Sequence, residues 1–160
     1  MTRTSHTPAS FEPDFVAGLK QMFEEQIAFN HLIGLKVDRL DPAGVAAHID
    51  MRPELVGHFS YNRLHGGVIS ASLDAMAGLA VMAAMGAKHL DEPPEQRLQR
   101  FGRLGTIDLR IDYLRPAIAP RFELQAQVLR LGSRVATARM EFHAAGGELL
   151  ATGSAAYIVS

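Results

Sequence analysis

One long apolar segment limits what this chain can fold into. Residues 68–85 carry a single charged side chain, that of Asp74. As a helix, the segment would be about 27 Å long. It is apolar on every side, and such a helix must be surrounded by other parts of the protein rather than laid on their surface. We therefore expect a helix over residues 68–85 at the centre of the fold.

Asp74 is the informative residue of this segment. An ionised carboxylate in apolar surroundings is costly unless it is paired, hydrogen-bonded or neutralised. Carboxylates in such positions concentrate at functional sites, although some only fix packing by reaching an arginine or a backbone amide. The residue pattern alone leaves both interpretations open.

The composition excludes several classes of function. The 160 residues favour a flexible tail at residues 1–10 followed by a single domain at residues 11–160. Without cysteine there is no disulfide framework, thiolate nucleophile or cysteine-based zinc site. The net charge of −1 gives no basic field that would favour nucleic acid or an anionic membrane. Walker, GxGxxG, HExxH and GxSxG motifs are absent.

The location of the protein is also an expectation from the sequence. The first ten residues are polar and lack the apolar core of a secretory signal, which favours the cytoplasm. Residues 68–87 have about the length of a membrane span, but Asp74, the many small residues and the strand-like flanks argue against one.

The spacing of apolar residues predicts the elements around the central helix. Spacings of three and four residues predict an amphipathic helix over residues 13–30. Alternation and turn residues predict six strands, at residues 35–40, 45–51, 106–113, 122–129, 135–143 and 149–159. For residues 86–105 we expect a connection with one short helical turn at 95–101, which is either merely solvated or serves as a lid or phosphate contact. Short links favour antiparallel pairing, so we expect an α+β fold with about six strands curled round the buried helix.

Several sequence blocks resemble a known enzyme family. Residues 64–69 read LHGGVI, with Asp74 nine residues after His65, which resembles the signature of hotdog-fold acyl-CoA thioesterases of the PaaI type. The blocks RPELVG, DAMAGL and GTIDLRIDYLRP are similar to the YigI group of medium- and long-chain acyl-CoA thioesterases. The resemblance covers roughly residues 15–160. It implies a hotdog fold that forms homodimers, often paired into homotetramers, with active sites between subunits.

The resemblance also implies catalytic roles. Asp74 matches the carboxylate that activates water or attacks the thioester directly. Gly66 matches the residue whose backbone N–H polarises the thioester carbonyl, and the unpaired N–H groups of a helix N-terminus suit that task. His65 orients the loop or the carbonyl, or is only a histidine bonded to backbone. Thr106 of the partner subunit helps to hold the attacking water.

Substrate contacts follow from the same resemblance. Relatives carry Asn or Gln where this chain has His58, and the nearby Asn62 is a possible substitute. Gly67 lies beside the thioester, while Ser133 and Arg134 occupy a turn that resembles the family's contact with pantetheine and phosphate. For the walls of the acyl pocket we expect Met76, Leu79, Met82 and Phe101.

Our hypothesis is a metal-free acyl-CoA thioesterase without a cofactor, which hydrolyses fatty acyl-CoA. A hotdog hydratase or dehydratase and a non-catalytic acyl-CoA-binding protein are the alternatives. Metal-dependent hydrolysis at His58, His65 and Asp74 is a third, with suitable ligand types but no recognised spacing. The chain length of the substrate, the metabolic route and the role of Asp74 as base or nucleophile stay open.

Overall fold

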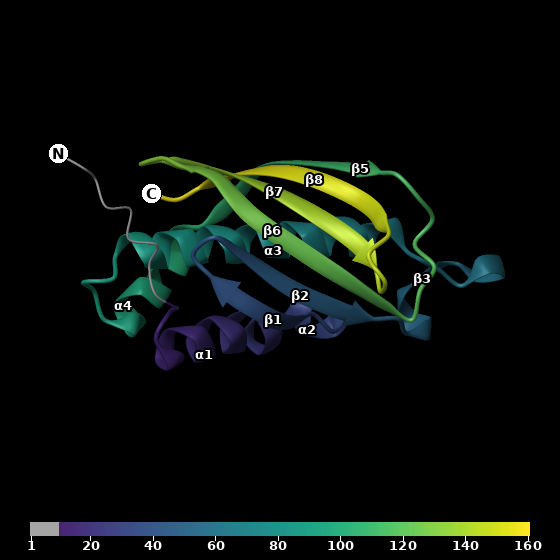
Figure 1. The fold of residues 1–160 in the computed structure, drawn as a ribbon, viewed down its shortest axis with the longest axis horizontal. Helices are drawn as coiled ribbons and strands as arrows, with labels where there is room; N and C mark the ends of the chain where they lie inside the picture. Colours follow the sequence, from purple (N-terminus) through teal and green to yellow (C-terminus); the bar gives the residue numbers. More distant parts are fainter. Residues whose placement is uncertain (1–9) are drawn as a thin grey trace.

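A curved antiparallel sheet packs against one long helix. The computed structural model describes residues 10–160, so most of the expected flexible tail lies outside the described residues. The sheet has the order β1-β2-β6-β7-β8-β5, and it curves over the helix α3 (Gly66–Lys88) (Figure 1). Its strands are β1 (Lys36–Asp41), β2 (Gly44–Asp50), β5 (Gly105–Tyr113), β6 (Arg121–Leu131), β7 (Val135–Ala144) and β8 (Leu149–Ile158). The predicted α+β hotdog architecture is therefore confirmed.

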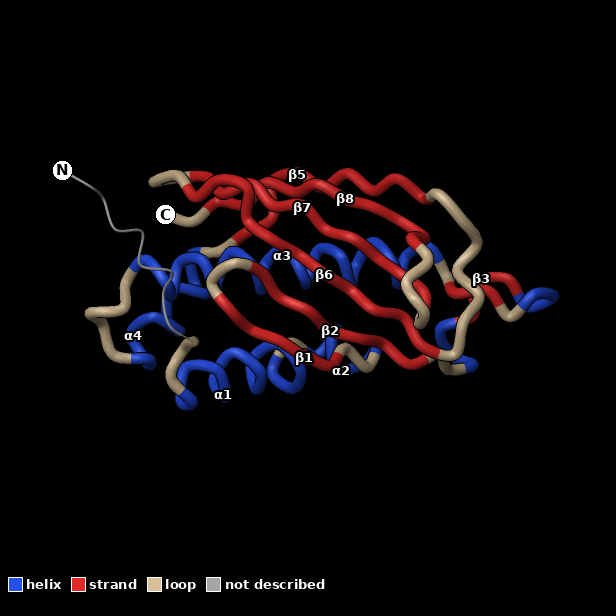
Figure 2. The backbone as a smooth tube through the Cα atoms, viewed as in Figure 1, coloured by secondary structure: helices blue, strands red, loops and turns tan. Residues whose placement is uncertain are grey.

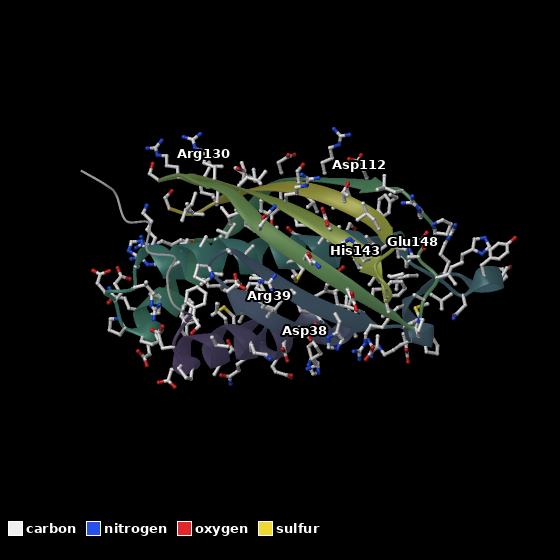
Figure 3. The ribbon with its side chains drawn as sticks, viewed as in Figure 1. Asp38, Arg39, Asp112, Arg130, His143 and Glu148 are labelled. Carbon is white, nitrogen blue, oxygen red and sulfur yellow. The ribbon has the colours of Figure 1, made fainter. Side chains whose placement is uncertain are left out.

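Alternation along the strands explains how the sheet meets the helix. On β6, Phe122, Leu124 and Ala126 are buried while the residues between them are exposed. The buried residues share one face because successive side chains of a strand point to opposite sides. The opposite face is polar, and Arg130 and Asp112 project from the surface (Figure 3). The inner face and α3 together form the hydrophobic core.

The central helix is open along part of one side, which corrects the expectation that it is wrapped all round. Ser70, Ala71, Asp74 and Ala75 are half-buried, because the sheet covers only one side of α3 (Figure 2). Among residues 10–160, α3 is the one helix long and apolar enough to cross a membrane, yet 67% of its most apolar window is buried inside the protein. It serves as the core helix of the fold.

The N-terminal helix is not continuous, which corrects the prediction for residues 13–30. It consists of α1 (Pro13–Gln21), a π-helical turn (Met22–Gln26) and α2 (Ala28–Ile33), with Ile27 extended between the last two. Glu24 lies in the π-helical turn and accepts a hydrogen bond of 2.8 Å from the Val37 N–H of β1. This contact ties the turn to the edge of the sheet, and α2 then takes a new direction.

A short two-stranded arm, which is not among the six predicted strands, precedes α3. The strands β3 (Val56–His58) and β4 (Arg63–Leu64) flank a 3₁₀ turn over Phe59–Tyr61. Both strands are too short for alternation to reveal them. The arm protrudes from the end of the molecule at which α3 begins (Figure 1).

The connection after α3 folds back onto the N-terminal helix. It contains α4 (Pro94–Gln99) and a 3₁₀ turn (Arg100–Arg103), in agreement with the helical turn expected at residues 95–101. Arg97 is fully buried, forms an ion pair with Glu12 and lies 4.3 Å from the centre of the Phe15 ring. Its guanidinium also donates to the Gly86 carbonyl of α3. These contacts fix the segment that leads into β5.

Candidate active site

Asp74 lies at the wall of an apolar pocket of about 290 Å³. The pocket is enclosed by α3, the start of β5, the end of β8 and the segment that follows α1. The Thr106 hydroxyl donates a hydrogen bond of 2.9 Å to Asp74 Oδ1. The hydroxyl that meets Asp74 is therefore that of the same chain, whereas the sequence analysis expected it from a partner subunit.

Tyr157 is the site residue that the sequence analysis missed. Its hydroxyl donates to Asp74 Oδ1 over 2.5 Å. Burial, followed by the hydrogen bond to Asp74, raises the pKa of Tyr157 above its ordinary value, so the hydroxyl stays protonated and remains a donor. The available signal was alternation in β8, where Tyr157 is the one aromatic residue among small buried residues. The pairing of Thr106 with Tyr157 between β5 and β8 places the Tyr157 side chain beside Asp74, which Thr106 also contacts.

His65 forms the N-terminal cap of α3. Its Nδ1 accepts a hydrogen bond of 2.8 Å from the Gly67 N–H. The Gly67 N–H is therefore not free to donate to a substrate. The Gly66 N–H has no such partner within residues 10–160. The Gly66 carbonyl accepts a hydrogen bond of 2.9 Å from the Tyr113 hydroxyl of β5. Of the two glycine amides, the Gly66 N–H is therefore the one open to a ligand.

Gly66 and Asp74 of one chain do not form a single site. Eight residues of α-helix separate them, which corresponds to about 12 Å along the helix axis. A thioester carbonyl beside the Asp74 carboxylate is therefore out of reach of the Gly66 N–H of the same chain. The structure brings Asp74 together with Thr106 but keeps both apart from residues 65–67.

His58 and Asn62 lie on the β3–β4 arm, away from the residues that line the Asp74 pocket. Asn62 adopts a left-handed backbone conformation with φ of 48°, which asparagine tolerates better than most residues. The His58 ring stands 4.9 Å from the Tyr61 ring, and its buried Nδ1 has no hydrogen-bond partner within the described part of the chain. Within one chain, neither side chain belongs to the Asp74 pocket.

Ser133 lines a second, cationic pocket near the C-terminal end of α3. This pocket of about 180 Å³ also contains Lys88, His89, Arg100 and Arg103. Arg100 is already paired with Glu92. Arg134 is exposed in the adjoining turn and its side chain does not line the pocket.

No cluster of three or more histidine, cysteine, aspartate or glutamate side chains within residues 10–160 is arranged to hold a metal ion. His58, His65 and Asp74 in particular do not come together. The geometry therefore gives no support to the metal-dependent alternative.

The chain is similar to known proteins in family, sequence and structure. Residues 61–151 match the model of the Thioesterase superfamily. The chain is 37% identical over 139 residues to the medium/long-chain acyl-CoA thioesterase YigI of Salmonella typhimurium, with 87% of this chain and 90% of the relative covered. The relative of the same name from Escherichia coli K12 is 36% identical over the same shares. A crystal structure from Shewanella oneidensis, described as related to the thioesterase superfamily, is 38% identical, with a TM-score of 0.85 and coverage of 94% and 100%.

The close approach of the arm to His65 gives a testable prediction. A Cβ added at Gly57 would lie 2.5 Å from the Cα of His65, so the backbone has to shift. We expect Gly57→Ala to lower the free energy of unfolding by about 1–3 kcal/mol, as overpacking usually does. Urea denaturation measures this change. Gly102→Ala is the control, because its Cβ would meet no atom within 4 Å, and equal stability of the two variants would contradict the prediction.

Proposed function

The chain belongs to the thioesterase superfamily and is a thioester hydrolase, and from this premise we propose that its substrates are medium- and long-chain fatty acyl-CoA. The products are the free fatty acid and coenzyme A. The observation that carries the proposal is the Asp74 carboxylate, held by two hydroxyl donors at the wall of an apolar pocket. A cytoplasmic location and independence from metals and cofactors belong to the same proposal.

Asp74 Oδ2 is the reacting oxygen in this proposal. Both Thr106 and Tyr157 donate to Oδ1, and neither bond reaches Oδ2. In the general-base route, water adds its oxygen to the thioester carbonyl carbon while Oδ2 takes the proton. The carbon–sulfur bond then breaks, and the proton passes to the departing thiolate of coenzyme A. Direct attack by Oδ2 on the carbonyl carbon would expel the thiolate and leave a mixed anhydride, which water then cleaves to the free acid and the Asp74 carboxylate. Both routes therefore place Asp74 at the reaction centre.

The oxyanion donor is assigned to Gly66 of the partner subunit. On β5, Thr106 contacts Asp74 and Tyr113 contacts Gly66. β5 is an edge strand whose outer side pairs with no other strand of residues 10–160. If two copies pair antiparallel along this edge, the Tyr113 end of one β5 lies opposite the Thr106 end of the other. This pairing brings Gly66 of the partner subunit next to Asp74, so a homodimer would complete two sites.

The contact of Ser133 and Arg134 with the phosphates of coenzyme A stays a prediction. Lys88 and Arg103 supply cationic groups at the pocket that Ser133 lines.

Asp74→Asn tests the proposed function. The amide keeps the shape of the side chain and cannot act as the base, so we expect turnover to fall by about a hundred- to ten-thousandfold while the oligomer persists. The measurement is release of free thiol from an acyl-CoA panel in buffer that contains EDTA. Undiminished hydrolysis by the variant would refute the mechanism. Water addition to crotonyl-CoA, without thiol release, would instead favour a hydratase.

Tyr157→Phe tests the second donor to Asp74. Loss of one hydrogen bond to a charged group is worth about 1.5–3 kcal/mol, so we expect kcat to fall by about tenfold or more with KM almost unchanged. Because the pKa of Tyr157 is raised, its ionisation should cause no loss of wild-type activity up to pH 10, the ordinary value for tyrosine. Thr137→Val, at an exposed position on β7, is a control that should leave both constants unchanged. A change in KM alone would contradict this role.

Gly66→Pro tests the division of the site between two subunits. Proline removes the N–H and is tolerated at the first position of a helix, and His65 already has the extended backbone that precedes proline. We expect a loss of about a hundred- to a thousandfold in kcat, whereas Gly66→Ala keeps the N–H and most of the activity.

Hybrids of the Gly66→Pro and Asp74→Asn chains then distinguish the two arrangements. In each hybrid dimer, one site combines an intact Asp74 with an intact Gly66, so mixing the two inactive proteins should restore activity. Mixtures that exchange subunits and stay inactive would place both groups within one chain.

A further inference from the structure

The pocket beside Asp74 is a groove along one face of α3. Its floor consists of Ala71, Asp74, Ala75 and Gly78, at the spacing that places helical residues on one side. Three of these four side chains are small, so the face is hollow next to the carboxylate. From Ala71 to Gly78 the floor extends about 10 Å along the helix axis.

The groove leads from Asp74 towards the C-terminal end of α3. Thr106 binds Asp74, and Leu104, two residues earlier in the chain, lies 3.7 Å from the Cβ position at Gly78, one helical turn further along. Phe101 comes three residues before Leu104 and also lines the pocket. The segment from Thr106 back to Phe101 therefore follows the groove away from the carboxylate.

Two phenylalanine rings in the lining of the groove contact each other. Phe23, in the π-helical turn, and Phe101 also line the pocket, and their ring centroids lie 5.8 Å apart in an edge-to-face arrangement. Phe23 is buried and Phe101 is half-buried, so the ring of Phe101 is the more easily removed. Ile27 and Phe29 also line the pocket. The break in the N-terminal helix places them there.

We propose that Gly78 and Phe101 set the acyl-chain length: the chain runs from Asp74 over Gly78 and ends against the Phe23–Phe101 pair. This inference rests on the proposed function. It replaces part of the expectation from the sequence, because Met76, Leu79 and Met82 are fully buried and do not line the pocket. Of the four predicted wall residues, only Phe101 does so.

Two substitutions should move the chain-length preference in opposite directions. In Gly78→Ala, the new Cβ would lie 3.5 Å from the Tyr157 ring and 3.7 Å from Leu104, which are ordinary contacts, and alanine favours the helix. The methyl group fills the floor, so we expect kcat/KM to fall for long chains and hold for short ones. Phe101→Ala removes the end wall, so we expect longer chains to gain over medium ones.

The experiment measures kcat/KM for straight-chain substrates from butanoyl- to octadecanoyl-CoA with wild type and both variants. We expect the ratio of long-chain to short-chain kcat/KM to fall about tenfold in Gly78→Ala and to rise about tenfold in Phe101→Ala. A tenfold change is the effect typical of one methylene in an apolar pocket. Gly102→Ala, at an open position in the 3₁₀ turn that contains Phe101, is the glycine-to-alanine control for Gly78→Ala. Phe11→Ala, which removes a buried ring outside the pocket, controls for lost stability.

A wild-type chain-length profile in both variants, or a shift in the same direction, would overturn the inference while leaving the hydrolase assignment intact. Absence of hydrolysis of any member by folded wild type would overturn the proposed substrate class. The groove is then tested without turnover, by calorimetric binding of the free fatty acids of the same lengths. If affinity depends on fatty-acid length in the same way in wild type and both variants, the proposed role of the groove is refuted.

Discussion

Two hydroxyl groups hold one carboxylate inside an apolar helix, and the rest of the structure depends on this interaction. An ionised group in such surroundings is tolerated only where donors replace the lost water. Thr106 and Tyr157 supply both donors from the neighbouring strands β5 and β8, because the register of these strands places the two residues opposite each other. A slip of one residue would turn the side chains of a strand to the other face. The register that pairs β5 with β8 therefore also determines how the two hydroxyl groups meet Asp74.

The open side of α3 carries the same carboxylate. In the proposed function Asp74 meets a substrate and cannot be covered by the sheet, which agrees with the small residues and the half-buried face around it. The broken N-terminal helix covers part of this face with Phe23 and Ile27 but leaves a pocket beside the carboxylate. The break at Ile27 is thus a feature of the site as much as of the fold.

The sequence was sufficient for the fold and for the carboxylate of the proposed site. Strand alternation and the long apolar segment predicted six strands and the central helix, since both patterns are local, and Asp74 stood out as the lone charge. Tyr157 could not be paired with Asp74 in advance, because that contact depends on a strand register between residues far apart in the sequence. The β3–β4 arm was too short for periodicity to show. The role of His65 as a cap, one of the interpretations considered, needed the observed bond between its Nδ1 and the Gly67 N–H.

Helix geometry supports the proposal that two copies of the chain share each site. Free N–H groups for an oxyanion exist only in the first turn of a helix, which lies near the protein surface. A carboxylate surrounded by apolar residues has to lie further along, and here the two are about 12 Å apart. One helix therefore cannot present both groups to the same carbonyl. In β5, the contacts to Asp74 and to Gly66 lie near opposite ends of one edge strand, at Thr106 and Tyr113. Antiparallel pairing of this strand with its own copy exchanges those ends, so symmetry can unite two groups that a single helix must keep apart.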